Sequence, residues 1–119
     1  MITKISMKRS EIWLINLNPT IGAEIQKTRP AIIVNDDALG LLPLRIIVPI
    51  TDWKNHYSTT VWMAKISPNS KNNLSKISGA DCFQVRSVST NRFIKKIGNV
   101  DTTEMEEIET ALANVLKIL

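Results

Sequence analysis

Residues 19–30, with the sequence Pro-Thr-Ile-Gly-Ala-Glu-Ile-Gln-Lys-Thr-Arg-Pro, place one carboxylate and two cations in a segment with the composition of a loop. Pro19 and Gly22 favour turns, and Pro30 restricts Arg29 to extended backbone angles before an apolar strand. A guanidinium offers paired donors that match phosphate oxygens, and it stays charged throughout a reaction. We therefore predict that Arg29 stabilises the negative charge that develops on a phosphate during substitution.

Two more residues have the chemistry to assist such a reaction. Glu24 is the only acidic residue of the loop, and it could act as a general base if burial or a like charge raised its pKa. Thr51 follows Val-Pro-Ile, where its hydroxyl could donate to a phosphate oxygen or orient a ribose hydroxyl. The alternatives are an ion pair between Arg29 and Glu24 that braces the loop, and an ordinary strand-end role for Thr51.

The rest of the sequence favours a reaction without a metal ion, because it has one histidine, one cysteine and no carboxylate cluster at metal-ligand spacing. RNA permits such a reaction, since its 2′-hydroxyl is a nucleophile already placed beside the scissile phosphate, and DNA lacks that group. The enzyme would help the 2′-oxygen lose its proton, stabilise the phosphorane and help the 5′-oxygen leave. RNA is therefore a substrate on which such a reaction is possible.

Residues outside the loop have side chains suited to RNA binding. Gln84 and Arg86 lie two apart, so on a strand both would face one side, as an amide for base edges and a cation for phosphate; the alternative is a structural cross-strand pairing. Trp53, in the segment 52–58, could stack on a base, and His56 could add an acid–base group. The remaining predicted RNA contacts are Thr20, Lys27, Thr28 and Lys54.

The elements that must position these residues are mostly strands. Short segments rich in Ile and Val, separated by Pro, Gly, Asn and Asp, predict strands at 12–17, 31–35, 44–50, 59–64, 82–88 and 92–96. Trp13 and Trp62 fall within these segments and are predicted to lie in the core, as is Cys82 as a small buried residue. The pattern predicts a small antiparallel barrel or curled sheet.

Helical signal is confined to the end of the chain and to one short turn. Asp101 and Glu104 form a capping box. The apolar residues that follow at helical spacing are Met105, Ile108, Leu112, Val115, Leu116 and Leu119. We expect an amphipathic helix that closes the core, a polar surface loop over 67–74, and a short helical turn near 74–77.

Length, composition and charge indicate what kind of protein this is. The 119 residues, 44% apolar, predict one domain over 1–119, with residues 1–7 a possible flexible extension. No apolar run or signal-peptide core suggests a membrane or export, and a single cysteine fits a reducing compartment, so a cytoplasmic protein is expected. Residues 101–119 carry a net charge of −4 and residues 1–100 a net charge of +8. The basic part would face a polyanion, unless it is simply a solvated basic surface.

An ordered set of short motifs resembles the MazF/PemK (Kid) family of toxin endoribonucleases of type II toxin–antitoxin systems. The match runs from about Lys8 to the C-terminus. It comprises Glu-Ile-Trp-Leu-Ile-Asn-Leu at 11–17, Asn-Pro-Thr-x-Gly-x-Glu at 18–24, Lys-Thr-Arg-Pro at 27–30, Val-Pro-Ile-Thr at 48–51, Gln-Val-Arg at 84–86 and Lys-Ile-Gly at 96–98. Each motif alone is common, but the order over about 110 residues is specific.

The resemblance implies a mainly β (α+β) fold, an SH3-like curled antiparallel β-barrel with a C-terminal helix, and a homodimer. It implies sequence-specific cleavage of single-stranded RNA, mRNA in particular, to 2′,3′-cyclic phosphate and 5′-hydroxyl ends, with no cofactor. It also implies a cognate antitoxin with an acidic, flexible segment, and binding to operator DNA only through the antitoxin complex. No membrane association is expected, because the sequence has no apolar run of the length needed to span a bilayer. The active-site threonine of the family's Pro-x-Thr motif falls at Thr51.

The chain departs from the family at two positions. Some members have a histidine where this chain has Ala23, and some have an aspartate where it has Phe83. Those groups are not available here, so the proton-transfer assignment is less secure than the phosphate-binding one, and recognition of bases near Phe83 is expected to differ from that in the family. Two other functional classes share the fold: a non-catalytic nucleic-acid-binding barrel, and a gyrase-poisoning toxin that acts through a protein interface.

Overall fold

A computed structural model describes residues 6–118, and within that range the chain forms seven strands and one α-helix. The strands are β1 (Glu11–Asn16), β2 (Thr28–Ile33), β3 (Leu44–Asp52), β4 (Met63–Ile66), β5 (Ser78–Asp81), β6 (Arg86–Ser89) and β7 (Phe93–Asn99). The helix is α1 (Thr102–Leu116). Four short 3₁₀ turns lie between strands: η1 (Asp37–Leu39), η2 (Asn55–Thr59), η3 (Cys82–Gln84) and η4 (Thr90–Arg92).

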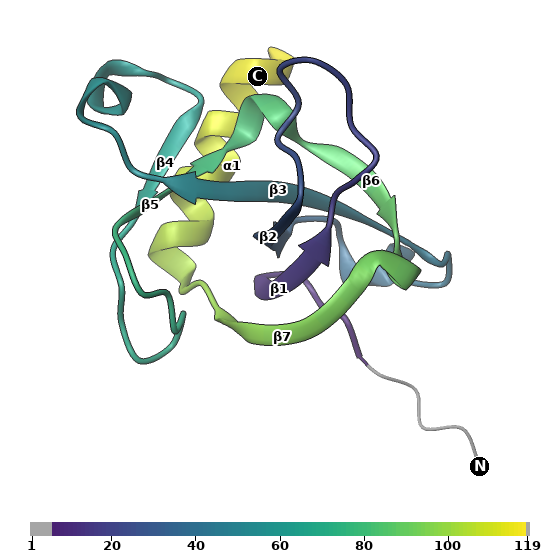
Figure 1. Cartoon of the computed structure of the whole chain (residues 1–119). Coiled ribbons are helices and arrows are strands. Elements are labelled where there is room, and N and C mark those ends of the chain that lie inside the picture. Colours follow the sequence, from purple (N-terminus) through teal and green to yellow (C-terminus); the bar gives the residue numbers. More distant parts are fainter. Residues whose placement is uncertain (1–5, 119) are drawn as a thin grey trace.

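The strands form one antiparallel sheet in the order β4-β5-β3-β2-β1-β7. The long strand β3 crosses the molecule (Figure 1) and changes partner along its length, pairing with β6 over its first half and with β5 over its last three residues. Within residues 6–118 the edge strands β4 and β7 do not pair with each other, so the sheet is curled but not closed. The predicted antiparallel, mainly β fold with a C-terminal helix is confirmed.

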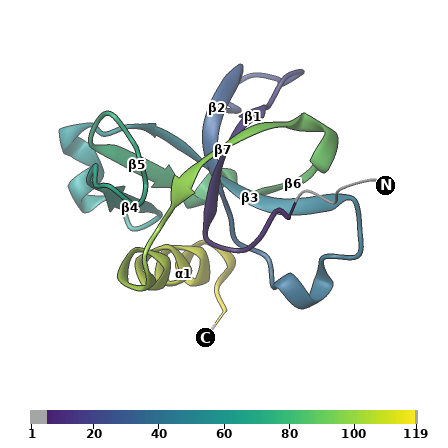
Figure 2. The same cartoon turned by 90° about the horizontal axis from the view of Figure 1, so that it is seen from below.

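Alternation of side chains gives the sheet a core on each face. On one face Ile12, Ile32 and Val48 pack with the buried side of α1, and Figure 2 shows α1 running along that side of the sheet. On the other face the buried cluster consists of Trp13, Ile15, Leu17, Ala31, Ile33, Ile47 and Val88. The core position predicted for Trp13 is confirmed.

The C-terminal helix begins where the sequence predicts. Asp101 accepts a hydrogen bond from the Glu104 N–H at 2.7 Å, and the Glu104 carboxylate accepts one from the Asp101 N–H at 2.9 Å. The buried residues of α1 are Met105, Ile108 and Ala111. Leu116, predicted on the apolar face, is 54% exposed, because α1 ends there and Lys117 turns left-handed. Leu119 lies outside the described residues.

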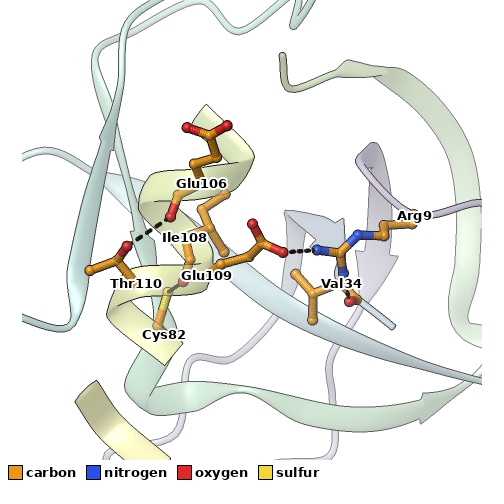
Figure 3. A network of polar contacts seen from close by, with 7 residues as sticks. All are labelled: Arg9, Val34, Cys82, Glu106, Ile108, Glu109 and Thr110. Carbon is orange, nitrogen blue, oxygen red and sulfur yellow. Dashed lines mark hydrogen bonds and ion pairs between the residues drawn. The ribbon is translucent and has the colours of Figure 1, made fainter. Parts of the chain in front are cut away.

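Arg9 links the segment before β1 to α1 and to Val34, the residue that follows β2 (Figure 3). The Arg9 guanidinium donates to Glu109 Oε2 at 2.6 Å, and its other terminal nitrogen donates to the Val34 carbonyl. Cys82 lies beneath the same helix with its Sγ 3.8 Å from the Ile108 carbonyl oxygen, and it is fully buried as predicted. Burial, with a smaller contribution from the charge of Asp81, raises the pKa of the Cys82 thiol to about 12, so Cys82 is a packing residue and not a nucleophile.

Several local predictions were wrong. The segment 59–64 contains the end of η2 and a turn, and β4 begins only at Met63, so Trp62 is 39% exposed instead of buried. The segment 82–88 divides into η3 and β6, and no helical turn forms at 74–77. β5 was missed because its sequence, Ser-Gly-Ala-Asp, lacks the branched residues that indicate strands.

The polar loop 67–74 is fixed against β7. The fully buried Asn72 side chain accepts hydrogen bonds from the Asn69 and Leu74 N–H groups at 3.0 Å, and it donates to the Ser67 carbonyl at 2.8 Å. Gly98 allows this approach, since a Cβ there would lie 2.4 Å from the Lys71 carbonyl oxygen. The loop therefore presents residues 74–78 at a defined place beside the sheet.

No helix in residues 6–118 is both long enough and apolar enough to cross a lipid bilayer.

Candidate active site

The loop between β1 and β2 folds on itself. The Glu24 carboxylate accepts a hydrogen bond from the Ile21 N–H at 2.5 Å, and the Glu24 N–H donates to the Ile21 carbonyl at 3.2 Å. Gly22 has a φ of +58°, a left-handed conformation that glycine adopts at little cost. At the base of the loop, Asn18 Oδ1 accepts from the Lys27 N–H at 3.0 Å. These contacts give the loop a defined shape.

Three side chains from the second half of the chain hold this loop in place. The Gln84 amide oxygen accepts from the Ile25 N–H at 2.6 Å, and its amide nitrogen donates to the Ala23 carbonyl at 3.0 Å. The Arg86 guanidinium donates to the Leu17 carbonyl at 3.3 Å. Arg92 donates to the Asn16 carbonyl at 3.1 Å and also to the Asn18 carbonyl. Gln84, predicted to read bases, thus uses both ends of its amide within the chain.

A groove of about 420 Å³ lies between this loop and the segment from η3 to β6. Its lining brings together three of the predicted site residues, Glu24, Gln84 and Arg86. The remaining lining residues are Ala23, Ile25, Pro49, Phe83 and Val85. The groove therefore combines a carboxylate, a guanidinium and apolar side chains, which suits a ligand with both charged and apolar parts.

A second, smaller hollow of about 190 Å³ contains the other two predicted catalytic residues, Arg29 and Thr51. Arg29 lies two residues before Ala31 and Thr51 two residues after Pro49, and Ala31 and Pro49 are paired between β2 and β3. Because side chains alternate along a strand, both point to the face of that pair. The Arg29 Nε donates to the Gln26 carbonyl at 3.3 Å. The hollow brings a cation and a hydroxyl together.

The wall of the smaller hollow comes from residues 74–78, which the loop 67–74 and Gly98 position. Leu74, Ser75, Lys76 and Ser78 line it. The Lys76 ammonium lies 3.8 Å from a carboxylate oxygen of Asp52, and both side chains are largely exposed. This ion pair joins two residues of the lining, so a ligand phosphate would meet both charges.

The two cavities lie along the same strand. Pro49 lines the groove and Thr51 the hollow, and two residues of a strand span about 7 Å. Arg29 and Glu24 line different cavities, and among residues 6–118 no ion pair joins them, so the bracing ion pair considered from the sequence is not formed. Within the same range no three His, Cys, Asp or Glu side chains gather as metal ligands.

The other predicted RNA contacts lie outside both cavities. Trp53 packs against Gly79 of β5 and against Tyr57, with ring centroids 5.6 Å apart, and Lys65 places its ammonium 5.4 Å from the indole centroid. His56 contacts Tyr57 at a centroid distance of 4.6 Å. The residues that line neither cavity are Thr20, Lys27, Thr28, Trp53, Lys54 and His56.

The prediction that Gln84 and Arg86 share one strand face was wrong, although both line the groove. Asp81 caps η3 by accepting a hydrogen bond from the Phe83 N–H at 3.1 Å, which turns the chain before β6 begins at Arg86. Burial raises the pKa of Asp81 above its ordinary value, against the hydrogen bonds from the Phe83 and Gln84 N–H groups.

From the sequence, Phe83 is named only as a departure from the family that affects base recognition, and Lys76 is not considered. Phe83 is 64% exposed on the groove, and its ring meets that of Trp62 at a centroid distance of 5.6 Å. The available signal was an aromatic residue between a capping Asp81 and a polar Gln84, a place where a buried strand residue is not expected. Lys76 gave no local signal, because only the docked loop brings it to the hollow.

Comparison with known proteins adds independent findings. The family described as "PemK-like, MazF-like toxin of type II toxin-antitoxin system" matches residues 8–116. The chain is 30% identical to Endoribonuclease MazF9 of Mycobacterium tuberculosis over 112 residues, 89% of this chain and 92% of that protein. It is 31% identical to Endoribonuclease PemK of Escherichia coli over 115 residues, 95% of this chain and 84% of that protein.

One solved structure similar to this fold is of an endoribonuclease in complex with its cognate antitoxin from a mycobacterial species. It matches with a TM-score of 0.76 over 96% of this chain and 98% of that chain. The two sequences are 18% identical, so this likeness concerns the fold.

Proposed function

We propose that this chain, which belongs to the PemK-like, MazF-like family of type II toxins, is an endoribonuclease that cleaves single-stranded RNA at specific sequences without a metal ion. The observation that carries the proposal is the joint placement of Arg29 and Thr51 in one hollow, beside a larger groove that contains Arg86. A strand of RNA lying across both cavities would place its scissile phosphate at Arg29 and an adjoining nucleotide in the groove.

The proposed reaction uses the nucleophile that RNA supplies. The 2′-oxygen loses its proton to a general base and bonds to phosphorus, and the 5′-oxygen leaves and takes up a proton. This exchange yields a 2′,3′-cyclic phosphate and a 5′-hydroxyl. In this scheme Arg29 stabilises the phosphorane charge, Thr51 donates to a phosphate oxygen or orients the 2′-hydroxyl, and Glu24 is the candidate base.

The geometry supports the roles of Arg29 and Thr51 more directly than the role of Glu24. Arg29 and Thr51 share a cavity, which supports a joint role at the phosphate. Glu24 lines the neighbouring groove and accepts a hydrogen bond from the Ile21 N–H, so it would act on the 2′-hydroxyl only from across the junction of the two cavities. Arg86 is the cation of the groove, and we assign to it the phosphate next to the scissile one.

The proposed partners follow from the family. Solved structures of similar fold include an endoribonuclease with its cognate antitoxin, and we propose an antitoxin for this chain whose acidic, flexible segment competes with RNA for Arg29, Lys76 and Arg86 in the two cavities. The functional form would be a homodimer, and operator DNA would be bound only through the antitoxin complex.

The test is to incubate the purified protein with a long single-stranded RNA in the presence of EDTA. Discrete fragments ending in a cyclic phosphate support the proposal. RNA that is bound but stays intact indicates a non-catalytic binding module, and inhibition of gyrase without any effect on RNA indicates the gyrase-poisoning class. An RNA with a single 2′-deoxy residue at the cut site should resist cleavage there, and cleavage of that bond at the normal rate would refute attack by the 2′-hydroxyl.

A variant tests the phosphate site directly. Arg29→Ala should lower the cleavage rate by at least ~100-fold with the fold intact, as expected for loss of one donor to the transition state. Lys8→Ala is the matched control, because it removes the same charge from an exposed residue that lines neither cavity. Equal rates for Arg29→Ala and Lys8→Ala would remove Arg29 from the mechanism.

A further inference from the structure

An exposed aromatic pair borders the groove. Phe83 is 64% exposed and Trp62 39% exposed, and their rings meet edge to face with centroids 5.6 Å apart and an angle of 66° between planes. Phe83 lines the groove together with Arg86, whereas Trp62 supports its ring from outside. One ring thus faces the cavity and is steadied by a second.

The backbone that carries Phe83 is fixed on both sides. Before it, Asp81 caps the turn and the Cys82 side chain is fully buried. After it, the Gln84 amide is bonded to the Ala23 carbonyl and the Ile25 N–H across the groove. The ring therefore projects from an anchored turn, and little conformational entropy is lost when a ligand packs on it.

The neighbours of Phe83 indicate what that ligand is. A nucleobase offers a planar face to an aromatic ring, and the phosphate attached to its sugar suits a guanidinium, which is the combination that Phe83 and Arg86 provide in one groove. Trp53, the tryptophan predicted to stack, packs instead against Gly79 and Tyr57.

We propose that Phe83, supported by Trp62, is the stacking platform for one base of the RNA, and that it sets the base preference at one position of the cleavage sequence. This inference rests on the proposed function. It assigns Phe83 a role in specificity and leaves the reacting phosphate to Arg29 and Thr51.

The test compares Phe83→Leu, which keeps an apolar side chain, with Phe83→Tyr, which keeps the ring. Since base stacking on an aromatic side chain contributes enough to change affinity about 10-fold to 100-fold, Phe83→Leu should lower kcat/KM by that factor and Phe83→Tyr should stay near wild type. Sequencing of fragment ends should show that Phe83→Leu relaxes the preference at one position. Leu41→Ala is the control, because Leu41 is 93% exposed and lines neither cavity.

Substrates with one abasic nucleotide identify the stacked base. When the missing base is the one that stacks on Phe83, wild type should cut the abasic substrate as slowly as Phe83→Leu cuts the intact substrate. Combining the abasic substrate with the Phe83→Leu variant should slow cleavage no further. The inference would be overturned if the rate loss from the abasic nucleotide multiplied with the rate loss from Phe83→Leu at every position tested. A Phe83→Leu variant with the wild-type rate and cleavage sequence would also overturn it. Weaker antitoxin binding by Phe83→Leu with unchanged RNA cleavage would also overturn it, since Phe83 would then serve a protein interface.

A binding measurement separates this inference from the cleavage proposal. Fluorescence anisotropy with a labelled 2′-deoxy oligonucleotide reports stacking without any reaction. If wild type cuts no RNA, the cleavage proposal fails. A loss of affinity for the oligonucleotide in Phe83→Leu, but not in Phe83→Tyr, would still support Phe83 as a stacking platform. Equal affinities of the two variants would refute it.

Discussion

The double hydrogen bond of Gln84 gives a sharp test of whether this residue latches the β1–β2 loop or reads bases. The change to make is Gln84→Met, which keeps the length of the side chain and removes its hydrogen bonds. The bond from the Ile25 N–H is partly buried and 2.6 Å long, and the bond to the Ala23 carbonyl is exposed and 3.0 Å long. Both join segments about 60 residues apart in the chain.

The magnitude follows from those two bonds. A partly buried hydrogen bond contributes about 1 kcal/mol net, and an exposed one about half as much, so the closed loop should lose about 1.5 kcal/mol. A loss of that size raises the population of the open loop about 10-fold. Amide hydrogen exchange in residues 17–27, measured by mass spectrometry, should therefore become about 10-fold faster.

The cleavage assay supplies the second readout. A latch should affect every RNA sequence equally, so Gln84→Met should lower kcat/KM by one common factor and leave the cleavage sequence unchanged. Gln26→Met is the matched control, because Gln26 is exposed on the same loop and no hydrogen bond of its side chain is seen within residues 6–118. Unchanged exchange together with an altered cleavage sequence would refute the latch and make Gln84 a base reader.

Two further predictions concern stability. Gly98→Ala should lower the free energy of unfolding by about 2 kcal/mol, because the new Cβ would lie 2.4 Å from the Lys71 carbonyl oxygen and the loop 67–74 would have to move; urea denaturation measures this, and a variant as stable as wild type would contradict the described packing. Burial alone would raise the pKa of Glu11, but hydrogen bonds from the Lys8 N–H, the Trp13 indole and Lys96, with the charge of Lys96, hold it below its ordinary value. The stabilising contribution of the ionised Glu11 carboxylate is then present above the unfolded-state pKa and is lost as pH falls through the lower folded-state pKa. The difference in free energy of unfolding between wild type and Glu11→Gln should therefore be largest near neutral pH and shrink below about pH 4. Urea denaturation across that range checks the sign, and a difference that grows on acidification would contradict it.

The elements that could be predicted from the sequence are those that depend on interactions between residues close together in the chain. The helix could be predicted from the Asp101 and Glu104 side chains, which satisfy each other's backbone N–H groups before an apolar repeat begins. β5 could not, because its Gly79 is required by close packing: a Cβ there would lie 2.7 Å from the end of the Met63 side chain and 3.3 Å from the Trp53 ring. Such a contact depends on tertiary packing, which no strand propensity encodes.

In the candidate site, too, some residues could be predicted from the sequence and others depend on tertiary packing. The neighbouring Pro30 indicated Arg29, whereas Thr51 was indicated by the resemblance to the family's Pro-x-Thr motif. The sheet register brings both into one hollow. Gln84 was expected on a strand, but the cap provided by Asp81 turns the chain there. Lys76 reaches the hollow only because Asn72 and Gly98 dock its loop, a contact between segments more than twenty residues apart.

The exposure of Phe83 has a consequence for how this protein can diverge. Its ring touches the solvent and Trp62, while the burial of Cys82 and the bonds of Gln84 maintain the turn that carries it. Substitutions at surface positions of this kind usually change stability by no more than about 0.5 kcal/mol. If Phe83 is the proposed stacking platform, a lineage could therefore change which RNA sequences are cleaved by exchanging this one side chain, while the scaffold remains as foldable as before.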